Sequence, residues 1–270
     1  MTMHLMRRLF FTLLLALQGL PVNADLLVLV HGYLGSAASW EESGVNAALT
    51  SNGWHRIGRG TAAVSGKAMQ EEPARRFYVA DLPSLAPLVI QADLLKGQIN
   101  RLGAARPDEP VILVGHSAGG VVARLLLVRH GQPHTKALIT IASPHLGTGR
   151  AIEALQATND SFPFRLVKRA VAGEIYDVVR GSRGVLLDLT PAQPGNLLHW
   201  LNRQPHPDIA YVSVLRTGPG GSGDELVPAF SQDMNRIPTL AGRSATRVVP
   251  ASHRLQPTDG VLLAEILKDL

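Results

Sequence analysis

A serine inside a short glycine-bearing stretch is the residue of this sequence best placed to do chemistry. Ser117 stands in Gly-His-Ser-Ala-Gly at 115–119, between an apolar run at 111–114 and apolar residues that return at helical spacing. A serine on such a sharp strand-to-helix turn is pushed outward, and small residues must flank it because the two backbones nearly touch. The helix N-terminus behind it offers free N–H groups and partial positive charge to an anionic intermediate. We interpret Ser117 as a nucleophile; the alternative is a glycine-rich turn with an idle serine.

A serine hydroxyl is a weak nucleophile near neutral pH and needs a base, and the base needs a partner that fixes its tautomer. In doubly wound hydrolases these groups follow in the order serine, acid, histidine, on loops at the carboxyl edge of the sheet. His253 follows the last predicted strand, and Asp224 follows a predicted strand and a glycine-rich loop. The order and the location therefore predict Ser117, Asp224 and His253 as the catalytic residues. Glu225 and Asp233 remain as alternative acids.

A second glycine-bearing loop lies near the start of the chain. An apolar run at 26–30 ends in His-Gly-Tyr-Leu-Gly-Ser at 31–36. Serine hydrolases of this architecture place one oxyanion donor in the loop after an early strand and the other on the residue after the nucleophile. We therefore expect the backbone N–H groups of Tyr33 and Ala118 to form an oxyanion hole. His31 is interpreted as a side chain that braces this loop rather than as a catalytic group.

Apolar runs that alternate with helical patterns must position these loops. Such alternation predicts right-handed crossovers and an α/β fold with a doubly wound, mostly parallel sheet that is covered on both faces. The predicted strands are rich in Val, Ile and Leu, as buried parallel strands are. They lie at 26–30, 77–80, 111–114, 136–142, 209–215 and 246–249.

The alternation stops at about 149–204. Apolar residues recur there at helical spacing without an intervening strand, namely Phe164, Val167, Val171, Ile175 and Val178. An insertion at the carboxyl end of a sheet strand would sit over the site. We therefore predict a helical cap; the alternative is a helix buried in the core.

The first 24 residues have the pattern of an export signal. Arg7 and Arg8 precede a short apolar run at 9–17, and Val-Asn-Ala at 22–24 supplies the small residues that a signal peptidase reads. We predict a signal peptide at 1–24, a mature domain at 25–270, and a periplasmic or secreted protein. The alternative is a retained segment that anchors the protein to the membrane.

The composition narrows the function classes. The formal charge of +5 falls to +3 without the signal segment, which holds two arginines and no acid, and no Lys/Arg block of nucleic-acid type occurs. The absence of cysteine excludes disulfides and thiolate metal sites. No cofactor, metal or nucleic-acid partner is expected.

Five segments carry a family resemblance: HGYLG at 31–35, GHSAGG at 115–120, SPHLGT at 143–148, DLTP at 188–191 and GDELVP at 223–228. Together they resemble the α/β-hydrolase serine esterases and lipases, in particular bacterial triacylglycerol lipases and inositol-deacylase-like esterases. The resemblance covers most of the mature chain. It implies an esterase or lipase with catalytic Ser117, Asp224 and His253 and oxyanion donors Tyr33 and Ala118.

The expected function is hydrolysis of a carboxylic ester with an apolar acyl chain, through an acyl-enzyme intermediate. The substrate would be a lipid or a small ester, with transient contact to a membrane or lipid surface. An acyltransferase or a thioesterase would use the same three residues and stays as an alternative. A catalytically silent binding module is the alternative from a different class.

Overall fold

A computed structural model describes residues 25–59, 74–104, 106–157, 178 and 181–270. The predicted signal peptide at 1–24 lies outside the described residues. So does most of the helical pattern predicted at 164–178.

Seven parallel strands form one sheet, in the order β2-β3-β1-β4-β5-β6-β7. Every neighbouring pair is parallel, from β2–β3 at one edge to β6–β7 at the other. This confirms the predicted fold class. The strands are β1 (Asp25–Val30), β2 (His55–Arg59), β3 (Arg75–Val79), β4 (Val111–His116), β5 (Thr135–Ile141), β6 (Ala210–Thr217) and β7 (Ser244–Pro250).

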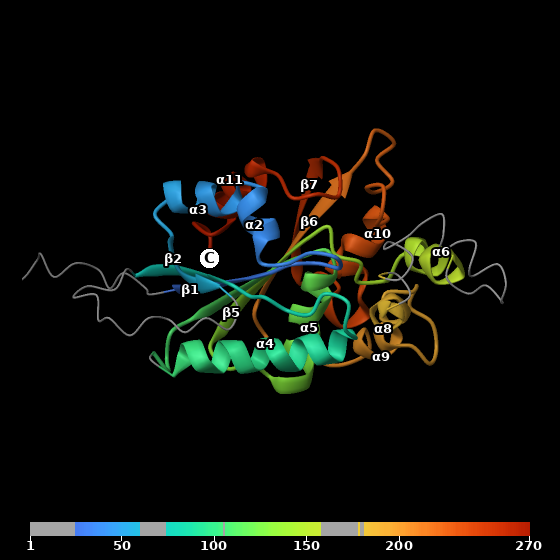
Figure 1. Cartoon of the computed structure of the whole chain (residues 1–270), viewed down its shortest axis with the longest axis horizontal. Coiled ribbons are helices and arrows are strands. Elements are labelled where there is room, and N and C mark those ends of the chain that lie inside the picture. The colour runs from blue at the N-terminus through green and yellow to red at the C-terminus, as the bar shows by residue number, and fades with distance from the viewer. Residues whose placement is uncertain (1–24, 60–73, 105, 158–177, 179–180) are drawn as a thin grey trace, which may run out of the picture.

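Helices cover both faces of the sheet (Figure 1). Alternate residues of β1 point to opposite faces, so Leu27 and Leu29 belong to one core and Leu26 and Val28 to the other. The first core is closed by α2 (Ala38–Glu42), α3 (Val45–Ser51) and α11 (Pro257–Ile266), and the second by α4 (Leu88–Gly103) and α5 (Ala118–His130). The central strands are buried on both sides, which explains their continuous apolar runs.

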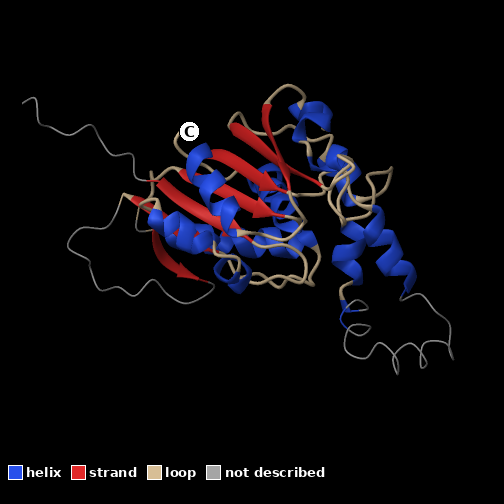
Figure 2. Ribbon diagram, turned by 90° about the horizontal axis from the view of Figure 1, so that it is seen from above, coloured by secondary structure: helices blue, strands red, loops and turns tan. Residues whose placement is uncertain are grey.

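The remaining helices gather beyond one end of the sheet (Figures 1 and 2). They are α6 (Gly149–Ala157), α8 (Arg183–Asp188), α9 (Leu197–Leu201) and α10 (Ala229–Gln232). Two 3₁₀ turns, η2 (Met234–Arg236) and η3 (Pro238–Leu240), connect α10 to β7. The Asp188 carboxylate accepts a hydrogen bond from the Leu88 backbone N–H at 2.8 Å and so caps the N-terminus of α4. None of the helices in the described ranges has the length and apolar character needed to cross a bilayer.

Residues 38–51 form two helices, α2 and α3, because Gly44 breaks the helical path with a φ of 78°. A Cβ at Gly44 would lie 3.1 Å from the ring of Pro257, so the break also makes room for the start of α11. The closing helix α11 begins at Pro257, since Gln256 and Asp259 form a capping box there.

The turn between β4 and α5 is packed backbone against backbone. A Cβ at Gly115 would lie 2.3 Å from the Cα and N of Gly120, and one at Gly119 would lie 2.4 Å from the carbonyl oxygens of Val30 and His31. Neither neighbour is the flexible end of a side chain. Glycine is therefore required at both positions by space alone.

Replacing Gly115 with Ala should lower the free energy of unfolding by about 1 to 3 kcal/mol or more, because the new methyl group must push the α5 backbone away from β4. Urea unfolding with an unchanged m-value measures this loss. Gly103→Ala is the matched control, since no atom lies within 4 Å of a Cβ added there. A loss under about 0.5 kcal/mol for Gly115→Ala would contradict this account of the turn.

Candidate active site

Ser117 sits at the junction of β4 and α5 in a strained backbone conformation. Its φ is 53° and its ψ is −128°, a region that residues with a side chain rarely occupy. The backbone holds it there, because the Ser117 N–H donates to the Ile141 carbonyl at 2.8 Å and the Gly120 N–H donates to the Ser117 carbonyl at 3.1 Å. The conformation points the hydroxyl away from the sheet and toward the loops beyond its carboxyl edge.

Three side chains from distant parts of the chain meet at this point. Ser117 Oγ lies 2.8 Å from His253 Nε2, and His253 Nδ1 lies 2.9 Å from Asp224 Oδ2. A carboxylate only accepts hydrogen bonds, so the imidazole proton is on Nδ1. Nε2 is then free to accept from the Ser117 hydroxyl. This arrangement allows a serine oxygen to lose its proton to a histidine as it attacks an electrophile.

Asp224 is fully buried and accepts four hydrogen bonds. Its Oδ1 accepts from the backbone N–H groups of Leu226 at 2.8 Å and Val227 at 2.7 Å, and its Oδ2 accepts from His253 and from Gln232 Nε2 at 3.3 Å. Burial alone would raise the pKa of this carboxyl, but the hydrogen bonds outweigh burial and hold the pKa below its ordinary value. Asp224 is therefore an anion near neutral pH.

The loop that carries Tyr33 lies directly against the serine. A Cβ at Gly32 would be 2.8 Å from Ser117 Cβ and 3.3 Å from its Oγ, so a side chain at position 32 would displace the loop. In the described part of the chain, the backbone N–H groups of Tyr33 and Ala118 donate to no protein acceptor. Tyr33 lines the cavity that Ser117 also lines, and Ala118 follows Ser117 directly as the first residue of α5.

His31 braces this loop. Its Nε2 accepts from the Leu82 backbone N–H at 3.0 Å, so Nδ1 carries the proton and donates to the Gly32 carbonyl at 3.1 Å. The ring is buried, and burial lowers its pKa, so it is neutral. The Tyr33 hydroxyl in turn hydrogen-bonds to Ser182 Oγ at 2.8 Å, which ties the loop to the start of α8.

A cavity of about 750 Å³ opens above Ser117 and His253. It has the size and mixed lining of a small-molecule site. One wall comes from α6, α8 and the residue after α8, and another from the Asp224 loop and the His253 loop. The apolar side chains that line it are Ala151, Ala154, Leu186, Leu189, Leu226, Val227 and Leu255.

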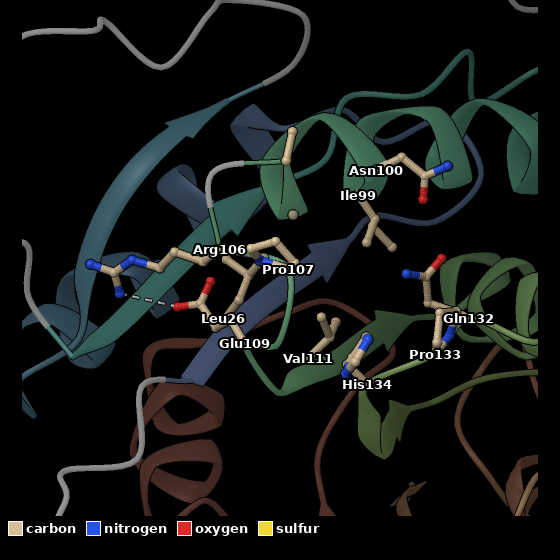
Figure 3. Close-up of a pocket in the computed structure, with 12 residues that line it drawn as sticks. Leu26, Ile99, Asn100, Arg106, Pro107, Glu109, Val111, Gln132, Pro133 and His134 are labelled. Carbon is tan, nitrogen blue, oxygen red and sulfur yellow. Dashed lines mark hydrogen bonds and ion pairs between the residues drawn. The ribbon is translucent and has the colours of Figure 1, made fainter.

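A second cavity, of about 310 Å³, lies at the opposite edge of the sheet (Figure 3). It is bounded by the first residues of β1 and β4, such as Leu26 and Val111, and by the end of α4. Its charged residues pair with protein groups, since Glu109 accepts from Arg106 at 3.4 Å and from Arg76 Nε at 3.0 Å. The hydrogen-bonded Ser117 and His253 side chains line the larger cavity and not this one.

The alternative acids lie elsewhere. Asp233 caps the 3₁₀ turn η2 by accepting from the Asn235 N–H at 2.9 Å. Glu225 contacts the backbone of His253, not its ring.

Two contacts have no signal in the sequence: the Gln232 amide on Asp224, and the His116 ring, whose Nε2 donates to the His253 carbonyl at 2.8 Å. Across the described residues, no group of three or more His, Cys, Asp or Glu side chains is placed to hold a metal ion.

Comparison with known families gives one match within this region. The model of the family described as PGAP1-like alpha/beta domain matches residues 21–172, which include the Tyr33 loop and Ser117. No sequence among the curated proteins matches the chain.

Solved structures of similar fold include lipases, esterases and a thioesterase. The mature lipase BlEst2 of Bacillus licheniformis aligns at 17% identity over 92% of each chain, with a TM-score of 0.63. A lipase-esterase related protein of Clostridium acetobutylicum aligns at 12% identity over 92% of this chain and 94% of that one, with a TM-score of 0.57. The RedJ thioesterase of Streptomyces coelicolor aligns at 17% identity over 92% and 86%, with a TM-score of 0.55. At these identities the likeness establishes the α/β-hydrolase fold.

As with His31, burial keeps His116, His145 and His206 neutral in the folded protein, and this should make the protein sensitive to acid. Burial, reinforced by the neighbouring His253, lowers the pKa of His116 to about 3. Burial likewise lowers the pKa of His206 to about 4 and that of His145 well below its ordinary value. In the unfolded chain these rings bind protons near pH 6.5. The unfolded state therefore binds more protons below pH 6.5, and stability falls as the pH falls, by about 1.4 kcal/mol per unit for each histidine.

The slope of unfolding free energy against pH between 6.5 and 5.5, measured by urea unfolding, tests this. His116→Gln should reduce the slope by about one proton. His55→Gln, the same substitution at an exposed position, is the control. Equal slopes for wild type and His116→Gln would show that His116 does not titrate as its burial requires.

Proposed function

The chain belongs to the PGAP1-like alpha/beta domain family, and from that premise we propose that it is a serine hydrolase that cleaves carboxylic esters of lipid or other apolar acyl type. The observation that carries the proposal is the hydrogen-bonded series Ser117–His253–Asp224 at the floor of the large cavity. A buried serine with only a structural role would not need a histidine in the basic tautomer aimed at its hydroxyl.

In the first half of the proposed reaction, Ser117 Oγ attacks the ester carbonyl carbon. The C–Oγ bond forms while the hydroxyl proton moves to His253 Nε2 and the carbonyl electron pair moves to oxygen. The backbone N–H groups of Tyr33 and Ala118 hold that oxyanion, and one such donor contributes about 3 kcal/mol to lowering the barrier. The intermediate then expels the alcohol, which takes the proton from His253.

In the second half, water attacks the acyl-enzyme. His253 Nε2 accepts a proton from the water, and the collapse of the second intermediate releases the carboxylic acid and restores the Ser117 hydroxyl. Asp224 remains an anion throughout and holds the imidazole in one orientation.

The lining of the cavity supports an apolar acyl chain. From α6, α8 and the residue after α8, four apolar side chains line the cavity beside the charged Arg150: Ala151, Ala154, Leu186 and Leu189. An acyl chain laid against them removes apolar surface from water, at about 25 cal/mol per Å². Hydrolysis of a p-nitrophenyl ester series from acetate to palmitate tests activity and chain-length preference together.

Thioester hydrolysis is a second candidate, because the RedJ thioesterase shares the fold. The same three residues accept either acyl donor. Comparing kcat/KM for an acyl p-nitrophenyl ester and the matching acyl thioester separates the two, and addition of an alcohol acceptor reveals acyl transfer.

Ser117→Ala should abolish ester hydrolysis, with a loss of about 10⁶ in kcat, because it removes the hydroxyl that is hydrogen-bonded to His253 Nε2. The melting temperature should stay close to wild type, since the hydroxyl contributes little packing. Labelling by a fluorophosphonate probe should be lost in parallel. Ser252→Ala is the control, because Ser252 is exposed, is next to His253 in the sequence, and only accepts a 3.4 Å contact from Gln256. Residual Ser117→Ala activity above about 1% of wild type would remove the nucleophile assignment.

Replacing Asp224 with Asn should lower kcat by about 10⁴, since an amide can stabilise the wrong imidazole tautomer. Asp233→Asn should remain near wild-type activity, because Asp233 bonds to η2 and to Thr246 rather than to His253. Steady-state kinetics with unfolding curves for both variants distinguish loss of function from loss of fold. The reverse ranking would transfer the role of the acid to Asp233.

A further inference from the structure

The backbone of His253 is held at both of its peptide groups by side chains from other parts of the chain. The Glu225 carboxylate accepts from the His253 N–H with both oxygens, at 3.2 and 3.1 Å. The His116 Nε2 donates to the His253 carbonyl at 2.8 Å. With Asp224 and Ser117 on its ring nitrogens, His253 has every polar group bonded to a named partner.

Regular structure does not supply this restraint. His253 lies at 251–256, between the end of β7 and the start of α11, where the chain is in neither strand nor helix. After it along the chain, Leu255 packs against the core and the Asp259 carboxylate pairs with the buried Arg216 guanidinium. These contacts lie two and six residues beyond His253 and do not involve its peptide groups.

Each of the two partners is the chain neighbour of a residue that binds the His253 ring. Glu225 follows Asp224 directly, so one dipeptide binds the histidine twice, at the ring through Asp224 and at the main chain through Glu225. The hydrogen bond is charge-assisted. His116 precedes Ser117 directly, so a second dipeptide also binds it twice.

His116 is well suited to a permanent donor role. Its ring lies between Trp40, edge-on at a centroid distance of 6.5 Å, and the His253 ring at 5.2 Å. A carbonyl only accepts, so the His116 proton is on Nε2. Because the pKa of the His116 ring is about 3, the ring is neutral near neutral pH while it donates to the His253 carbonyl.

We propose that Glu225 and His116 are positioning residues that fix the main chain of His253, so that its ring faces Ser117 and Asp224 at once. The inference rests on the proposed function. Neither residue is bonded to the reacting atoms; each bonds to the histidine backbone, and the His116 ring also lies 5.2 Å from the His253 ring. Since misplacing a catalytic group by about 1 Å can cost 10²-fold in rate, the expected effect is on kcat rather than on substrate binding.

The test compares variants that keep the hydrogen bond with variants that remove it. Glu225→Gln retains an acceptor oxygen and His116→Gln places an amide donor where Nε2 lies, whereas Glu225→Ala and His116→Leu retain neither. We expect Glu225→Ala and His116→Leu to lower kcat for a p-nitrophenyl ester about 10- to 100-fold with KM unchanged. The glutamine variants should recover most of that loss. Glu265→Ala, an exposed acid on α11, is the control and should match wild type.

The Nδ1 proton of His253 gives a readout that does not depend on the substrate. In wild type its hydrogen bond to Asp224 should give one sharp downfield proton resonance, which the alanine and leucine variants should broaden and the glutamine variants should keep. If wild type cleaves no ester but the resonance responds in this way, the proposed function fails and the positioning role stands. If kcat changes less than about threefold and the resonance is unaltered in both Glu225→Ala and His116→Leu, the inference is overturned.

Discussion

The contact of β4 with α5 at Gly115 and Gly120 is the constraint on which the site depends. The two backbones approach so closely that a single methyl group cannot enter, and Ser117 is left in a conformation that costs free energy. That cost, of order 1 to 3 kcal/mol, is offset by packing of the strand and helix into cores on both sides of the sheet. The partly exposed position of the Ser117 hydroxyl is therefore a consequence of core packing.

The parallel sheet decides which other residues can reach that hydroxyl. All seven strands run in one direction, so the loops after β1, β4, β6 and β7 open at the same edge. Ser117 and His253 are 136 positions apart in the chain, yet their side chains hydrogen-bond. Chain order on such a sheet therefore carries spatial information, which is why an acid after β6 and a histidine after β7 could be assigned before any coordinate was known.

The central strands and the Ser117 turn could be predicted because their signals are local and strong. β2 could not, because its sequence HRIGR is polar and it lies at the sheet edge, where only one neighbour and one partly covered face constrain it. The break at Gly44 follows from contact with Pro257, which is distant in sequence. Glu225 illustrates the same limit within the site: its sequence position made it a candidate acid, while its contact with a backbone N–H depends on two loops meeting.

Side-chain bonds to backbone groups, rather than regular structure, hold the loops of the site together. The Thr148 hydroxyl at the start of α6 donates to the Leu226 carbonyl, and Arg150 Nε donates to the Glu225 carbonyl at 3.1 Å. The Leu226 N–H is one of the donors to Asp224. The start of α6 and the Asp224 carboxylate are thus joined through Leu226. A shift of α6 that widened the cavity would pull on the same peptide groups that orient Asp224 and, through Glu225, His253. The wall that would receive an acyl chain and the groups that would cleave it are therefore coupled by hydrogen bonds that meet at Glu225 and Leu226, and not only by proximity.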